Sequence, residues 1–201
     1  MQKLPRSFYT QRTLTVAKEL LGKIFVRKIG NKFISGMIVE TEAYLFNDPA
    51  SHSFRGLTER NRPMFNNGGF LYVYFTYGMH YCANVVSYKE GIGEAVLIRA
   101  VEAIDGIEVM MRNRFKNKDG VHLNGDLHLQ NLTNGPAKFA EAFALTKTKS
   151  GIDLCGKEIF ISEGEAIHKS KITTTTRIGI SSAKDKKWRF YIKGSEWISR
   201  K

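Results

Sequence analysis

The sequence lacks most features that mark secreted, membrane-spanning or metal-clamped proteins. It has only two cysteines, Cys82 and Cys155, far apart and in no ligand-spaced motif, which disfavours a disulfide framework and a zinc site. No apolar run approaches the length that crosses a bilayer. Residues 1–9 contain no apolar signal-peptide centre, so we expect an intracellular protein. Its short termini favour a bacterial cytoplasm over a nucleus.

Common cofactor signatures are missing as well. The sequence has no Walker loop, no dinucleotide-binding glycine fingerprint and no nucleophile elbow. The histidines show no spacing that specifies a metal: His52, His80, His122, His128 and His168. The sequence therefore implies neither a metal nor an organic cofactor.

Acidic residues are scarce relative to basic ones. The chain carries 31 Lys and Arg against 19 Asp and Glu, a net charge of +12 over 201 residues. Such an excess favours a polyanionic partner, with nucleic acid ahead of an anionic membrane surface. Several basic side chains are candidates for phosphate contacts, although any one of them can equally be a solvated charge: Arg55, Arg60, Arg62, Lys138, Lys184, Lys186, Lys187 and Arg189.

Hydrophobic periodicity predicts a single mixed α/β domain over residues 1–201, with a mainly antiparallel sheet. Helices are expected at residues 13–21, 104–114 and 135–145. Strands are expected at residues 23–29, 32–44, 70–75, 80–88, 94–102, 158–162, 171–180 and 189–193. Residues 45–69 and 115–134 are expected to form long loops, and a loop as long as the first is more often functional than idle.

Two glutamates near the end of the strand predicted at 32–44 are candidates for acid–base chemistry. Because side chains alternate along a strand, Glu40, Glu42 and Tyr44 share one face, with the two carboxylates roughly 7 Å apart. That spacing is compatible with hydrolysis of a glycosidic bond. A solvated polar face on an edge strand is the competing interpretation, and the spacing does not choose between the two glutamates.

Arg99 and Tyr77 are each unusual for their predicted surroundings. Arg99 lies inside an apolar strand, where a cation needs a carboxylate partner, and the Glu40/Glu42 pair can supply one. A purely structural ion pair is the alternative. Tyr77 lies at a hairpin turn, where small polar residues are usual. An exposed ring there suits insertion between base pairs, but the ring can also fold back onto its own sheet.

Tyrosines crowd the middle of the chain. In the strand predicted at 70–75, Tyr72 and Tyr74 share one face, while Leu71, Val73 and Phe75 share the other, which is expected to be core. The tyrosine face can form the wall of a pocket that stacks a nucleic-acid base. Ordinary cross-strand packing is the alternative.

Several segments spread over most of the chain form a specific combination. They are residues 38–45 (IVETEAYL), 50–53 (ASHS), 60–65 (RNRPMF), 71–82 (LYVYFTYGMHYC), 96–100 (VLIRA), 134–138 (NGPAK) and 189–195 (RFYIKGS). In order and spacing they resemble the alkyladenine (3-methyladenine) DNA glycosylase family. The resemblance implies a single compact α+β domain with a curved, mainly antiparallel sheet, surrounding helices and a protruding hairpin that enters DNA.

The resemblance also implies roles for individual residues. Glu42 matches the general base that activates water, and Arg99 matches the partner that helps to hold that water. Tyr77 matches the residue that fills the gap left by a flipped nucleotide. The remaining matches form the pocket for the flipped base, with Tyr44 and Tyr74 on its two faces, His52 at its edge, Asn84 discriminating against guanine and the Ile192 carbonyl as a third ligand of the water.

The DNA-contacting surface expected from charge and resemblance comprises Val73, Arg55, Arg60, Arg62, Met79, His80, Tyr81, Lys138 and Lys193. Together these features imply a monomeric, monofunctional glycosylase that flips alkylated or deaminated purines out of double-stranded DNA and leaves an abasic site. Because no lysine lies in the matched pocket motifs, no Schiff base or strand cleavage is expected. The lesion range and the general acid for neutral bases stay open, as do two other classes, a non-catalytic nucleic-acid-binding module and an unrelated nucleoside or glycoside hydrolase.

Overall fold

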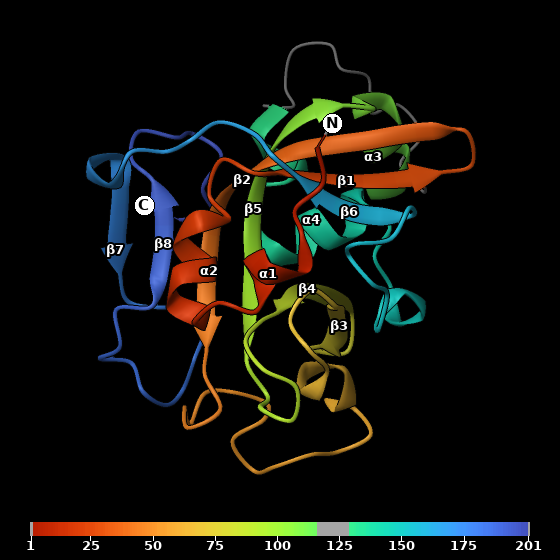
Figure 1. Cartoon of the computed structure of the whole chain (residues 1–201). Coiled ribbons are helices and arrows are strands. Elements are labelled where there is room, and N and C mark those ends of the chain that lie inside the picture. Colours follow the sequence, from red (N-terminus) through yellow and green to blue (C-terminus); the bar gives the residue numbers. More distant parts are fainter. Residues whose placement is uncertain (1, 116–128, 201) are drawn as a thin grey trace.

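An antiparallel sheet is the framework of the computed structural model, which describes residues 2–115 and 129–200 (Figure 1). Within them, the strands follow the order β3-β4-β5-β2-β1-β6, and β8 joins β2 to β7. The strands are β1 (Ile24–Ile29), β2 (Lys32–Tyr44), β3 (Leu71–Thr76), β4 (His80–Val86), β5 (Ala95–Asp105), β6 (Ile159–Ser162), β7 (Ile172–Thr175) and β8 (Arg189–Ile192).

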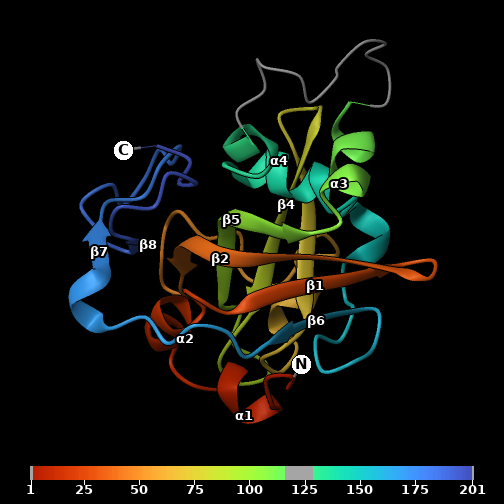
Figure 2. The same cartoon turned by 90° about the horizontal axis from the view of Figure 1, so that it is seen from above.

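Short helices cover the sheet on two sides: α1 and α2 lie on one side, and α3 and α4 on the other (Figure 2). The α-helices are α1 (Arg6–Tyr9), α2 (Thr13–Glu19), α3 (Ile107–Arg114) and α4 (Pro136–Ala142). The 3₁₀ segments are η1 (Arg62–Phe65), η2 (Leu129–Leu132), η3 (Lys147–Lys149) and η4 (Lys169–Lys171). Buried Phe25 of β1 packs edge-on against Phe139 of α4 and against Phe143, with ring centroids 5.1 and 5.4 Å apart. The predicted α+β class is confirmed.

Strand β2 changes its neighbour halfway along. Its first half pairs with β1, and residues 40–42 pair with β8, while β5 runs along its other edge. The register with β5 shifts between Ile38 and Glu40 and again between Glu40 and Thr41. Such bulges bend a strand and re-aim its side chains. The opposite face of this stretch is fastened to α2, because the Thr41 hydroxyl donates to the Ala17 carbonyl at 2.7 Å.

The hairpin tip between β3 and β4 projects into solvent. Tyr77 and Gly78 both have left-handed backbone, with φ of 51° and 68°, a turn geometry that matches the twist of paired strands. A tyrosine adopts positive φ only at a cost. The ring of Tyr77 is 80% exposed and Met79 is 70% exposed, so Tyr77 does not fold back onto the sheet.

Several predicted boundaries need correction. The strand predicted at 94–102 extends to Asp105, and the helix predicted from residue 104 begins only at Ile107, because Gly106 (φ 73°) breaks the strand. The strand predicted at 171–180 ends at Thr175. Phe75, predicted to be core, is 45% exposed near the hairpin tip, where it packs only on Tyr81 among the aromatic rings described. The loop predicted at 115–134 falls largely on residues 116–128, which lie outside the described residues.

The exposure of Tyr77 predicts that its side chain adds little to stability. Tyr77→Ala should change the free energy of unfolding by less than about 0.5 kcal/mol. The matched control Phe25→Ala removes a fully buried ring and should cost about 3–5 kcal/mol. Urea denaturation measures both. A large loss of stability in Tyr77→Ala would mean that the ring packs on the protein in solution.

Candidate active site

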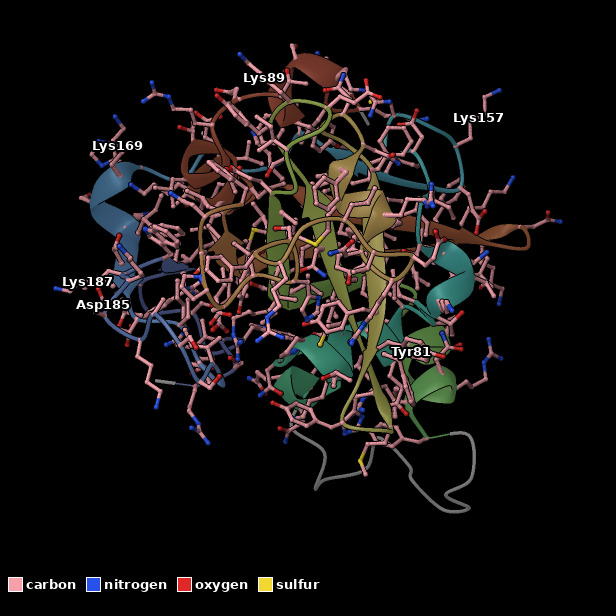
Figure 3. All side chains as sticks on the ribbon, turned by 90° about the horizontal axis from the view of Figure 1, so that it is seen from below. Tyr81, Lys89, Lys157, Lys169, Asp185 and Lys187 are labelled. Atoms are coloured by element: carbon pink, nitrogen blue, oxygen red, sulfur yellow. The ribbon has the colours of Figure 1, made fainter. Side chains whose placement is uncertain are left out.

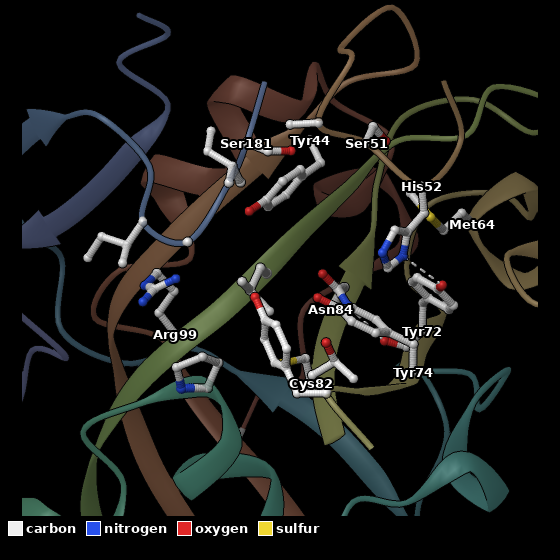
Figure 4. A pocket seen from close by; sticks show the side chains of 18 of the residues that line it. Tyr44, Ser51, His52, Met64, Tyr72, Tyr74, Cys82, Asn84, Arg99 and Ser181 are labelled. Carbon is white, nitrogen blue, oxygen red and sulfur yellow. Dashed lines mark hydrogen bonds between the residues drawn. The ribbon is translucent and has the colours of Figure 1, made fainter. Parts of the chain in front are cut away.

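A pocket of about 480 Å³ opens beside the carboxyl-terminal half of β2, within the usual size range of small-ligand sites (Figure 4). Five parts of the chain surround it: Tyr44 with the loop that follows, the β3–β4 hairpin, β5, Pro136 at the start of α4 and residues 178–181. Tyr44 faces the group formed by His52, Tyr72 and Tyr74 across the opening (Figure 4). The pocket is therefore built from segments that are distant in sequence.

Glu42 is fully buried behind three residues that line this pocket, Tyr44, Arg99 and Ile178. Its Oε1 accepts a hydrogen bond from the backbone N–H of Ile178 at 2.8 Å and lies 3.2 Å from Nη1 of Arg99. Its Oε2 accepts from the hydroxyl of Tyr44 at 2.8 Å. These three donors fix the orientation of the carboxylate.

Glu40 lies behind Glu42 and is held by a different set of donors. It accepts from Nε of Arg99 at 3.1 Å, from Nε of Arg189 at 2.6 Å, and from the N–H and hydroxyl of Ser199 at 2.6 and 2.9 Å. A carboxylate with this many partners is structural. The geometry thus separates the two glutamates, which their spacing in the sequence did not.

Arg99 bridges the two carboxylates. Burial would lower its pKa, but the adjacent Glu42 and Glu40 outweigh that effect, and the pKa is raised. Arg189 is a correction to the predicted phosphate contacts: it is 5% exposed and bound to Glu40, and it also donates to the Arg200 carbonyl. It cannot reach a phosphate without leaving that ion pair.

The aromatic wall is held together by ring contacts. The ring of His52 stands edge-on to Tyr74 with centroids 4.4 Å apart, and its Nδ1 lies 3.0 Å from the hydroxyl of Tyr72. Tyr72 and Tyr74 pack 5.5 Å apart at an interplanar angle of 30°. Desolvation against these rings, with the nearby charge of Arg60, lowers the pKa of His52, so the imidazole is neutral at neutral pH.

Asn84 lines the pocket with its amide fixed by a bond from Nδ2 to the Tyr72 carbonyl at 3.1 Å. Ile192 does not line it. Ile192 lies in β8 opposite Ile172, and its carbonyl accepts from the Ser195 N–H at 3.2 Å. Residues 178–181 line the pocket instead, and Ile178 supplies the backbone group that touches Glu42.

Sequence reasoning missed Cys82 and residues 178–181 as parts of the pocket. Cys82 lies on the same face of β4 as Asn84, so strand alternation could have included it. Burial raises the pKa of its thiol, which keeps it protonated. Residues 178–181 carried one signal, Gly179, whose φ of 75° ends any regular strand there.

The predicted DNA-contacting residues are mostly exposed. Arg55, Arg60, Arg62, Met79, His80 and Lys193 are exposed, whereas Tyr81 and Lys138 are half-buried and Val73 is buried. Arg60 donates to the Phe75 carbonyl at 2.9 Å and lies 5.6 Å from the Tyr74 ring, at the pocket rim. Arg62 is paired with Glu59, and Lys138 donates to Asn134 at 2.7 Å. The labelled lysines of Figure 3 point away on several sides, so the positive charge is not confined to one face.

Within the described ranges, no group of three or more His, Cys, Asp and Glu side chains is arranged to hold a metal ion. Of the predicted histidines, His122 and His128 lie outside those ranges. No helix in residues 2–115 or 129–200 is long and apolar enough to cross a membrane.

Comparison with known proteins identifies the class as that of DNA glycosylases, which are hydrolytic enzymes. The family model for methylpurine-DNA glycosylase matches residues 7–196, and the chain belongs to this family. A relative from Francisella tularensis subsp. tularensis (strain FSC 198) is 48% identical over 193 residues, covering 94% of this chain and 95% of its own length. Others from Carboxydothermus hydrogenoformans and Desulfitobacterium hafniense are 45% and 44% identical over 98% and 100% of this chain and 99% and 100% of their own. All three bear the provisional name 3-methyladenine DNA glycosylase.

The two glutamates should differ sharply in their effect on stability. Glu40→Gln leaves Arg189 and Arg99 with a neutral partner and should cost about 3–5 kcal/mol, the usual effect of breaking a buried ion pair. Glu42→Gln should cost less, about 1–3 kcal/mol, because Arg99 keeps Glu40. Urea denaturation of both variants measures the difference. Equal losses would contradict the assignment of Glu40 as the structural carboxylate.

Proposed function

We propose that this glycosylase flips an alkylated or deaminated purine out of duplex DNA into the pocket and hydrolyses its N-glycosidic bond. The observation that carries the proposal is the setting of Glu42. This carboxylate is fully buried, and the three residues that hold it, Tyr44, Arg99 and Ile178, all line the pocket.

Glu42 acts as the general base. An ionised carboxylate offers about four acceptor sites, and the donors from Ile178, Arg99 and Tyr44 use three of them. One site on Oε2 is left to accept the proton of a water molecule. As the bond breaks, positive charge develops on the sugar, and the negative charge of Glu42 stabilises it.

The aromatic wall binds the base. Tyr44 and Tyr74 offer ring faces for stacking, which every base permits. An alkylated purine such as 3-methyladenine carries a positive charge, which adds cation–π attraction to the rings. The neutral state of His52 supports the same choice, because a protonated imidazole beside the base would repel it.

The product is an abasic site. The residues that line the described pocket include no lysine, so no amine is available there to form a Schiff base with the sugar. Tyr77, exposed at the hairpin tip, takes the place of the flipped nucleotide in the stack. The chain works as a monomer, since its partner surface is DNA.

Replacement of the base residue tests the mechanism. Glu42→Gln should retain binding to lesion-containing duplex DNA and should lose excision by about 10²–10⁴-fold, the usual contribution of a positioned general base. Single-turnover release of the free base from alkylated duplex DNA measures it. Glu158→Gln, at an exposed site away from the pocket, is the control and should excise normally. Undiminished excision by Glu42→Gln would remove Glu42 from the mechanism.

Two variants of Tyr77 test whether its aromatic ring acts as a wedge: one removes the ring and the other removes only the hydroxyl. Tyr77→Ala should slow base flipping and weaken capture of the lesion, while Tyr77→Phe keeps the ring and should behave like the unaltered protein. Stopped-flow fluorescence of a base analogue beside the lesion follows flipping directly. Equal kinetics for the Ala and Phe variants on duplex DNA would eliminate the wedge.

A further inference from the structure

A fully buried ion pair lies directly behind the pocket. Arg177 and Asp48 both have 0% side-chain exposure, and the two terminal guanidinium nitrogens of Arg177 reach the carboxylate: Nη2 to Oδ1 at 3.0 Å and Nη1 to Oδ2. The proposed mechanism uses neither residue. Buried ion pairs seldom stabilise a protein more than apolar side chains of the same size would. The hydrogen bonds of such a pair are directional, however, and here they connect two segments that line the pocket.

The guanidinium of Arg177 lies between two aromatic rings. Its central carbon is 4.7 Å from the centroid of Tyr44 and 5.1 Å from that of Trp188. Nη1 also donates to the Ala43 carbonyl at 3.0 Å, next to Tyr44 in the chain. Nε, by contrast, has no hydrogen-bond partner in the described residues. The Nε of Arg177 is thus buried without a hydrogen bond, while the guanidinium stays stacked against Tyr44.

The same ion pair holds two segments that line the pocket, residues 49–52 and residues 178–181. Asp48 organises the turn that leads to His52, since its Oδ1 accepts from the Ala50 N–H at 3.1 Å and its carbonyl accepts from the Ser51 N–H at 2.8 Å. On the other side, Arg177 directly precedes Ile178, whose N–H donates to Glu42 at 2.8 Å. Ser181 of this segment lines the pocket together with Tyr44 (Figure 4).

We infer that Arg177, held by Asp48, is a positioning residue that sets the orientation of Glu42 through both of its uncharged donors. It backs the Tyr44 ring so that the Tyr44 hydroxyl reaches Oε2, and it fixes the start of residues 178–181 so that the Ile178 N–H reaches Oε1. Arg177 itself does not line the pocket, so it acts through Tyr44 and Ile178, which do. The inference rests on the proposed function, because it gives Arg177 the role of positioning Glu42, the proposed general base.

Two variants separate positioning from folding. Arg177→Ala would leave Asp48 charged and buried without a partner, and the protein can then simply fail to fold. The double variant Arg177→Met/Asp48→Asn removes both charges at similar volume and should fold. Arg177→Lys keeps the charge opposite Asp48 but loses the planar group that stacks on Tyr44 and binds in two places. Arg6→Met/Asp153→Asn removes a partly exposed ion pair between residues that do not line the pocket, and it serves as the control.

The expected result is a loss of chemistry in folded protein. Single-turnover excision should fall about tenfold to a hundredfold in the double variant and in Arg177→Lys, the scale of a small misplacement of a catalytic group. Lesion-DNA binding should change far less, and the control pair should excise normally.

Coupling to Tyr44 makes the test specific. Tyr44→Phe removes only the hydroxyl that Glu42 accepts from, so the Arg177 variants should lose less activity in that background than alone. Normal excision by folded Arg177→Met/Asp48→Asn would overturn the inference. That outcome differs from failure of the proposed function, in which Glu42→Gln itself excises normally.

Discussion

The structure depends on one buried arrangement of charge, in which Arg99 is shared between Glu40 and Glu42. Glu40 also binds Arg189, so two carboxylates and two guanidiniums are buried together. Neither glutamate could be buried alone, because an unpaired ion in a low-dielectric interior costs several kcal/mol. The arrangement joins β2, β5 and β8, and Ser199 adds the end of the described chain. The carboxylate of Glu42, the proposed general base, is thereby fully buried among charged and polar partners.

The path of β2 makes this arrangement possible. Because the strand bulges around Glu40 and exchanges β1 for β8 as its neighbour, the glutamate face meets Arg189 of β8 on one side and Arg99 of β5 on the other. The opposite face stays in the core through Thr41 and α2. If β2 were straight and paired only with β1 on that edge, Glu40 and Glu42 would be present but Arg189 of β8 would not reach them. The bend is thus part of the site as well as of the sheet.

Much of the site follows from local pattern, and the rest from contacts between distant segments. The pairing of Arg99 with the glutamates could be predicted, because a cation in an apolar strand needs a partner wherever it lies. The burial of Arg189 could not be predicted, since no local pattern distinguishes it from the other basic residues of the chain. Phe75 was mispredicted for a related reason: strand alternation gives the face but not how far the sheet extends over the core. Arg177 and Asp48 are 129 residues apart, and nothing local in either reveals the other.

The charges directly behind the pocket largely cancel, whereas Arg60 at its rim keeps a positive charge 5.6 Å from the Tyr74 ring, and both facts matter for the cationic base of the proposed function. Arg177 behind Tyr44 would weaken the attraction of that ring for a cation, but Asp48 neutralises it at hydrogen-bond distance. Glu40 and Glu42 balance Arg99 and Arg189, and the lowered pKa of His52 removes a further positive charge. The Tyr44 ring therefore keeps its attraction for positive charge. In the proposed mechanism, the one acceptor position of Glu42 that its three donors leave unused is on Oε2, and it receives the proton of the water molecule.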